Sequence, residues 1–353
     1  MAKKKQAEQL IIGGQQVMPG ERVTIEIPVA PMYTHDTVSI SVLVKRGRLP
    51  GPTLFVCAAI HGDEINGVEI IRRLLKNPVL NRLKGTLIAI PIVNIYGFIH
   101  HTRYLPDGRD LNRSFPGSPR GSLTGRLAHT FMNEVVAKCT HGIDLHTGAR
   151  HRSNFPQIRA DLDDEATMGL TTAFGAPLAI NAKIRDGSLR QCASDMGVPV
   201  ILYESCEALR FDEIYIRAGE QGVINVMRHL GMLRKSRAHT RPPVICQGTH
   251  WIRAPESGVL RALVPLGAEV APGQVIGIIA DPLGSTEIDV VTNEGGIVIG
   301  RTNLPLVYEG DALFHLASLN PKAQWEVEEF HEALEPTEQE SNPEDPSSSP
   351  IAG

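Results

Sequence analysis

The chain has 353 residues, of which 42% are hydrophobic and 21% charged, and its formal net charge at pH 7 is −4. These values are typical of a globular protein and give no global positive field, so we expect no nucleic-acid partner. The five cysteines are scattered, odd in number and without a CxxC pair, which disfavours both a disulfide framework and a cysteine-based zinc site.

The N-terminal segment, MAKKKQAEQLIIGGQQ, carries only a three-residue apolar run. Such a run is too short for the apolar core of a signal peptide. No apolar stretch approaches the roughly 18 residues that cross a bilayer. We therefore expect a cytoplasmic protein without a membrane partner.

Strand-like and helix-like patterns alternate along the first 240 residues. Residues 22–47 show the period-two alternation of antiparallel strands. Residues 51–60 and 85–94 are continuous apolar runs, typical of strands buried on both faces. Residues 64–77 place apolar side chains at helical spacing. The alternation predicts an α/β domain over residues 1–240, with a mixed, mostly parallel sheet flanked by helices.

The pattern changes near residue 240. Residues 241–322 contain short strand-like pieces separated by glycine turns and no helical pattern of useful length, which predicts a small all-β, barrel-like domain. Residues 323–353 end in an acidic stretch that is rich in proline and serine and lacks aromatic residues. We expect this tail to be largely disordered.

Polar side chains stand at the ends of two predicted strands. His61 and Glu64 follow the apolar run 51–60, and Asp144 and His146 lie in the short strand-like segment GIDLHTG. Ligands of open α/β sheets bind at the carboxyl ends of the strands. Two histidines and a glutamate, with a water as fourth ligand, form one of the catalytic zinc arrangements. A single HxxE would match by chance, but three ligands at two strand ends favour a metal site.

A hydrolytic zinc site also needs a general base that is not a ligand. Glu204 directly follows the apolar run VILY, again at the end of a predicted strand. Glu207 lies three residues later and is the rival for this role. The alternative for either residue is an exposed or capping carboxylate.

Between the two ligand segments runs a long irregular stretch, residues 94–122. Long loops in compact domains are usually functional or disordered, and the aromatic residues of this one favour a functional loop. Three arginines are candidates for binding an anion or polarising a carbonyl: Arg103, Arg109 and Arg113. A guanidinium group binds a carboxylate through two parallel hydrogen bonds. For Arg109 we expect instead a simple pairing with a neighbouring aspartate.

Four motifs in this order, HGDE, RYLPDGRDLNRSFPG, DLHTG and ILYE, resemble the succinylglutamate desuccinylase/aspartoacylase family. The match covers roughly residues 50 to 235 of the chain. The resemblance implies a zinc carboxypeptidase-like fold and one Zn²⁺ per chain. Since the four motifs occur together, the resemblance is far more specific than the HxxE alone.

The resemblance also implies a role for each matching residue. Glu204 looks like the general base that activates the water and later protonates the leaving amine. Arg103 is similar to the arginine that polarises the scissile carbonyl, and Asp144 would stand behind His146. The substrate carboxylate would be held by Asn112 and Arg113. The implied zinc ligands are His61, Glu64 and His146.

The chain departs from the family pattern at two places. Ser205-Cys206-Glu207 follows Glu204 where many members have a glycine, which leaves Glu207 open as the base. The inserted segment around residues 106–108 argues against carrying over aspartate specificity. The C-terminal domain resembles half of a biotinyl/lipoyl-type barrel but has no lysine at the central hairpin, so a structural or substrate-capping role is expected.

These observations predict a zinc-dependent hydrolase that cleaves the amide bond of an N-acyl amino acid or a related small molecule. Ester hydrolysis is chemically close, and a metallocarboxypeptidase-like peptidase is the first alternative. A non-enzymatic ligand-binding protein is less favoured, because the catalytic set is intact. The acyl group, the amino acid and the oligomeric state stay open, with a homo-oligomer as one alternative.

Overall fold

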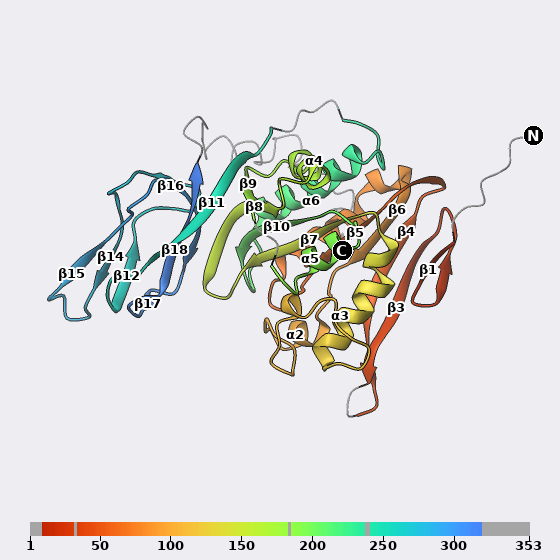
Figure 1. Ribbon diagram of the computed structural model, residues 1–353, viewed down its shortest axis with the longest axis horizontal. Helices are drawn as coiled ribbons and strands as arrows, with labels where there is room; N and C mark the ends of the chain where they lie inside the picture. Colours follow the sequence, from red (N-terminus) through yellow and green to blue (C-terminus); the bar gives the residue numbers. More distant parts are fainter. Residues whose placement is uncertain (1–8, 32–33, 183–184, 237–240, 320–353) are drawn as a thin grey trace, which may run out of the picture.

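A computed structural model describes residues 9–31, 34–182, 185–236 and 241–319 (Figure 1). The expected disordered tail, residues 323–353, lies outside the described residues. Within the described ranges, no helix is both long and apolar enough to cross a membrane.

One long sheet runs through the described residues. Its N-terminal strands are β3 (Arg22–Pro31), β4 (Thr37–Arg46), β5 (Leu49–Ala58), β6 (Lys84–Ile90), β7 (His141–Gly148), β8 (Arg152–Ala160), β9 (Leu178–Asn181) and β10 (Val200–Glu207). Its C-terminal strands are β11 (Val244–Arg253), β13 (Glu269–Val270), β16 (Gly296–Thr302) and β18 (Ala312–Leu319). The strand order is β13-β16-β18-β11-β9-β8-β10-β7-β5-β6-β4-β3.

The direction of the strands corrects one expectation. Strands β10, β7, β5 and β6 pair in parallel at the centre, but β8 is antiparallel to β10 and β4 is antiparallel to both β6 and β3. The sheet is therefore mixed, and a mostly parallel sheet is not confirmed. The turn between β7 and β8 spans only residues 149–151, whereas a parallel return needs a crossover of a dozen residues or more.

Helices cover both faces of this sheet. On one face, α1 (Asn66–Lys76), α4 (Glu165–Phe174) and α6 (Glu213–His229) bury Ile70, Leu170 and Val223 against strand residues such as Leu54. On the other face, α3 (Leu123–Glu134) and α5 (Leu189–Asp195) bury Leu127 and Leu189 against neighbouring side chains such as Phe55. Successive strand residues point to opposite faces, so the apolar runs of the sequence supply both cores.

Short elements complete the domain. A hairpin of β1 (Leu10–Ile12) and β2 (Gln15–Val17) precedes the sheet. Helix α2 (Ile95–Ile99) and three 3₁₀ turns, η1 (Pro78–Arg82), η2 (Leu111–Arg113) and η3 (Val136–Lys138), stand in the connections. Turn η2 lies within the long loop that carries the DLNR motif.

The C-terminal strands help to form a barrel that is not separate from the long sheet. Besides the sheet order above, β16 also pairs with β8, which closes β8, β9, β11, β18 and β16 into a ring. Two of these five strands thus come from before residue 240. A second sheet packs beyond the barrel, at the left of Figure 1, and consists of β12 (Gly258–Ala262), β14 (Val275–Ala280), β15 (Glu287–Val291) and β17 (Leu306–Val307).

His315 on β18 is a buried ionisable group of this barrel. Its ring is stacked on Trp251 of β11, with ring centroids 4.3 Å apart and an interplanar angle of 5°. Burial, and after it the positive charge of Arg159, lowers the pKa of His315 from 6.5 to about 3. The folded protein therefore holds this imidazole neutral under conditions in which an unfolded chain protonates it.

His315 should make the stability of the protein depend on pH. Because its pKa is lower in the folded state, its contribution is fully present above about pH 6.5 and is lost as the pH falls toward about 3. Between pH 6.5 and 4.5 the free energy of unfolding should drop by about 2 kcal/mol more in the wild type than in His315→Asn. Urea titrations of both proteins at the two pH values measure this difference, and equal drops would contradict it.

Candidate active site

The turn between β5 and α1 presents His61 and Glu64. Strand β5 ends at Ala58, Ala59 takes a left-handed conformation with φ of +50°, and α1 begins at Asn66. A Cβ atom on Gly62 would stand 2.0 Å from the carbonyl carbon of Gly97, so only glycine fits at this point of the turn. The close packing of the two glycine backbones therefore fixes the path of the HGDE segment.

Strand β7 supplies the second pair of side chains. Asp144 and His146 are two residues apart and so project from the same face of the sheet. In the parallel pairing of the strands, Asp144 stands opposite Cys57 of β5, and His146 stands opposite Glu204 of β10. The sheet register thus brings these residues to the end of β5 and next to Glu204.

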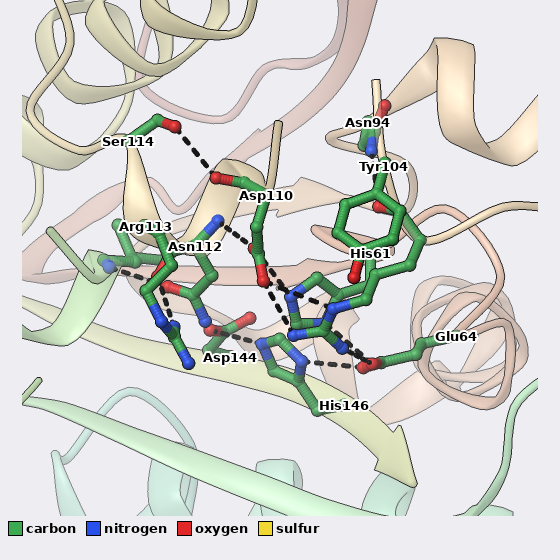
Figure 2. A network of polar contacts seen from close by, with 12 residues as sticks. His61, Glu64, Asn94, Tyr104, Asp110, Asn112, Arg113, Ser114, Asp144 and His146 are labelled. Carbon is green, nitrogen blue, oxygen red and sulfur yellow. Dashed lines mark hydrogen bonds and ion pairs between the residues drawn. The ribbon is translucent and has the colours of Figure 1, made fainter. Parts of the chain in front are cut away.

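The three residues expected to bind a metal meet in a buried cluster. The Nδ1 atoms of His61 and His146 each lie 2.7 Å from a different carboxylate oxygen of Glu64. The candidate ligand atoms of the three residues all lie within 4.8 Å of one another. Figure 2 shows both imidazoles turned toward Glu64. The three residues are almost completely buried, with exposed fractions of at most 4%.

Each imidazole has a second carboxylate on its other nitrogen. The Nε2 atom of His146 lies 2.8 Å from Asp144, and that of His61 lies 3.2 Å from Asp110. A carboxylate on the far nitrogen orients a metal-binding histidine and makes it a stronger donor. Two imidazoles and a carboxylate that converge through Nδ1, Nδ1 and Oε, each imidazole held from behind, fit a bound divalent metal ion.

The charges of the cluster also fit a bound divalent metal ion. Burial alone would raise the pKa of Glu64, but the two imidazoles outweigh it and hold that pKa well below its usual value. Burial would lower the pKa of His146, whereas Asp144 and Glu64 raise it well above 6.5. A metal ion can take the place of the proton that balances these carboxylates, so metal binding should release protons.

Arg103 lies beside this cluster. Its guanidinium donates to Glu64 through Nη1 at 3.2 Å and to Asp110 through Nη2 at 2.9 Å. The side chain is 26% exposed, so part of it is accessible from the solvent. Arg109, in contrast, is exposed, and it is its backbone N–H that donates to Asp107, at 3.3 Å.

Asp110 is a site residue that the sequence argument missed. It accepts hydrogen bonds from Arg103 and from the backbone N–H of Asn112, and it contacts His61. Burial would raise its pKa, but His61 and Arg103 lower it well below the usual range. The signal available in the sequence was its place at the start of the DLNR motif.

Asn112 and Arg113 follow on turn η2, next to the cluster in Figure 2. The Oδ1 atom of Asn112 accepts a hydrogen bond of 2.9 Å from the backbone N–H of Leu189, the first residue of α5. Arg113 donates through Nη1 to the backbone oxygen of Asn112 at 2.5 Å. Among the described residues, no carboxylate pairs with Arg113, and burial lowers the pKa of its guanidinium.

The two rival glutamates lie in different surroundings. Glu204 stands next to His146 across the β10–β7 pair, and its Oε2 accepts a hydrogen bond of 3.2 Å from Arg159 of β8. Glu207 accepts hydrogen bonds from the backbone N–H of His151 and from the side chain of Asn303. Arg159 had no signal in the sequence, because only the β8–β10 pairing brings it to Glu204.

Comparisons with known proteins identify the family of this chain. The model of the succinylglutamate desuccinylase/aspartoacylase catalytic domain matches residues 50–230. The N-alpha-acetyl-L-2,4-diaminobutyric acid deacetylase of Halomonas elongata is 27% identical over 291 residues, which are 78% of this chain and 84% of that protein.

Solved structures share the fold. A succinylglutamate desuccinylase/aspartoacylase from Rhodobacter sphaeroides has a TM-score of 0.76 at 24% identity and covers 86% of this chain and 96% of its own. The product-bound ectoine utilization protein EutE from Ruegeria pomeroyi has a TM-score of 0.75 at 24% identity and covers 85% of this chain and 97% of its own. At these identities the matches show a common architecture.

The carboxylates behind the imidazoles should tune metal affinity. We expect Asp110→Asn and Asp144→Asn each to weaken the binding of a divalent metal by about 10- to 100-fold, since each leaves a histidine less basic and less firmly oriented. Competition with a chromogenic chelator measures the affinity. Asp107→Asn is the matched control on the same loop, because Asp107 bonds Thr124 and contacts neither imidazole. Unchanged affinity in both variants would contradict the prediction.

Proposed function

Since the chain belongs to the succinylglutamate desuccinylase/aspartoacylase family, we propose that it is a metal-dependent hydrolase that cleaves the amide bond of an N-acyl amino acid. One observation carries this proposal: a buried His61–Glu64–His146 cluster stands directly beside a carboxylate, Glu204, that is not part of it. The relative from Halomonas elongata, described as a deacetylase of an N-acetyl amino acid, supports the substrate class.

Zinc is the metal that we propose, one ion per chain, held by His61, Glu64 and His146. Two imidazoles and one carboxylate are a catalytic zinc set that leaves a position for water. When bound, zinc lowers the pKa of a coordinated water to about 7 and polarises a carbonyl oxygen.

Glu204 is the general base in this proposal. Its carboxylate takes a proton from the attacking water and returns it to the nitrogen of the leaving amine, so that the proton count balances over the reaction. Glu204 pairs across the strands with His146, a member of the proposed metal cluster. The hydrogen bond from Arg159 orients its carboxylate. Glu207 suits this role less well, because both of its oxygens already accept hydrogen bonds.

Arg103 is proposed to stabilise the developing oxyanion. Its guanidinium is held by Glu64 and Asp110, so it does not have to reorganise when charge builds up on the substrate oxygen. Fixed donors of this kind are worth several kcal/mol in a site that excludes water.

Arg113, with Asn112 beside it, is proposed to hold the carboxylate of the substrate. Among the described residues the Arg113 guanidinium has no carboxylate partner, and an arginine fork binds a carboxylate through two parallel hydrogen bonds. Such a clamp orients the amide bond relative to Glu204. It also explains why an amino acid, rather than an uncharged amide, is the proposed substrate.

The base is tested by replacing each glutamate. In Glu204→Gln, kcat on the best N-acyl amino acid of a panel should fall by about 1000-fold while zinc stays bound, because the amide cannot accept the proton. Steady-state kinetics together with metal analysis of the same samples measure both quantities.

Glu207→Gln is the matched variant on the same strand, and its kcat should fall far less. A greater loss in Glu207→Gln than in Glu204→Gln would assign the base to Glu207. Zinc-loaded wild-type protein that hydrolyses esters or C-terminal peptide bonds, but no N-acyl amino acid, would replace the proposed substrate class.

The carboxylate clamp is tested with paired substrates. Arg113→Ala should raise KM for an N-acyl amino acid by about 10- to 100-fold, the loss expected for a charge-assisted hydrogen-bond pair. The same substrate with its carboxylate converted to a carboxamide should be poor for the wild type and should lose little more in the variant. Equal losses on both substrates would show that Arg113 does not bind the carboxylate.

A further inference from the structure

The segment after Glu204 is held in a strained conformation. Cys206 and Leu209 adopt left-handed backbone angles, with φ of +67° and +57°, although neither is a glycine. The pairing of β10 also changes register here, between Glu204 and Cys206 on the β8 side and between Glu204 and Glu207 on the β7 side. Such backbone states cost of order 1 kcal/mol or more each and persist only where surrounding contacts enforce them.

Some of these contacts come from the segments that carry the metal cluster. The backbone N–H of Leu209 donates to the oxygen of Asp63 at 2.8 Å, and that of Ala208 donates to the oxygen of Gly148 at 3.0 Å. Asp63 lies in the HGDE turn, and Gly148 ends strand β7. The strained segment is therefore tied to both ligand-bearing segments of the site.

Further contacts reach this segment through the Glu207 side chain. Its Oε1 accepts the backbone N–H of His151 at 2.9 Å, and its Oε2 accepts the Nδ2 of Asn303 at 2.8 Å. Asn303, directly after β16, also donates its backbone N–H to the oxygen of His151 at 2.7 Å, and its Nδ2 lies 2.5 Å from Ser153. The Glu207 side chain is only 16% exposed.

We propose that Glu207 and Asn303 form a latch through which the barrel positions Glu204 for catalysis. Glu207 and Asn303 are positioning residues in this assignment, since they act through the strand that bears the base. The assignment rests on the proposed function for its effect on turnover. It gives Glu207, the rival glutamate of the sequence, a role of its own.

The hydrogen bonds of the latch have a fixed polarity, which makes a sharp test possible. Both oxygens of Glu207 accept, and the Asn303 amide donates. Asn303→Asp sets two carboxylates against each other, whereas in Glu207→Gln the Asn303 amide must turn over so that its Oδ1 accepts from the new amide nitrogen. The double variant reverses the polarity of the contact: Gln at 207 donates to Asp at 303 and still accepts from the N–H of His151.

The test uses the full-length, zinc-loaded chain in five forms: wild type, Asn303→Asp, Glu207→Gln, the double variant, and Arg253→Ala. Arg253 is the control, because its hydrogen bond to the oxygen of Gly310 stays within the C-terminal domain. Amide hydrogen exchange of peptides that cover residues 203–210 reports the latch itself. Values of kcat and KM for an N-acyl amino acid report its consequence.

In Asn303→Asp we expect exchange of residues 203–210 to rise about tenfold and kcat to fall about tenfold, at unchanged KM and zinc content. Glu207→Gln should change both in the same direction but by less, because the Asn303 amide can turn over and accept from the new amide nitrogen. The double variant should return both quantities to within about threefold of the wild type, and Arg253→Ala should leave them unchanged.

Each other outcome overturns the proposal at a defined step. Unchanged exchange in both single variants shows that there is no latch. Raised exchange with unchanged kcat shows that the latch does not position Glu204. A double variant as impaired as Asn303→Asp shows that the Glu207–Asn303 contact is not the element that matters. If the wild type hydrolyses no N-acyl amino acid, the proposed function fails, while the exchange data still decide whether the latch exists.

Discussion

The buried carboxylate of Glu64 is the constraint on which the rest of the site depends. An ionised carboxylate this deep costs several kcal/mol unless its oxygens are paired. One oxygen meets His61 and Arg103, and the other meets His146 and the backbone N–H of Thr147. These partners come from the β5–α1 turn, from the long loop and from strand β7. The fold must therefore bring three distant segments together before this charge is tolerated, and the same convergence creates the candidate metal site.

Strained backbone occurs at two of the strand ends that meet at this site. Ala59, two residues before His61, and Cys206, two residues after Glu204, both adopt left-handed angles. Each of them stands where a strand leaves its regular pairing, within two residues of a side chain of the site. The cost is modest beside the stability of the two cores that surround the central strands.

The sequence predicted those parts of the structure that depend on local pattern. Apolar runs predicted β5 and β6, helical spacing predicted α1, and four motifs predicted the family, which the match over residues 50–230 confirms. The clustering of His61, Glu64 and His146 followed from their positions at strand ends. Contacts made only by strand pairing could not be predicted. Arg159 reaches Glu204 only because β8 runs antiparallel beside β10, and Asn303 reaches Glu207 only because β16 pairs with β8.

The shared strands of the barrel have a consequence for the order in which the protein folds during synthesis. Strands β8 and β9 leave the ribosome early, but β11 begins 63 residues and β16 begins 115 residues after the end of β9 (244 − 181 and 296 − 181). Until then, the edge of the nascent sheet carries unpaired backbone groups and uncovered apolar side chains such as Leu178 and Ile180. The catalytic half thus cannot complete its folding ahead of the C-terminal half, and the chain should unfold as one cooperative unit rather than as two independent modules.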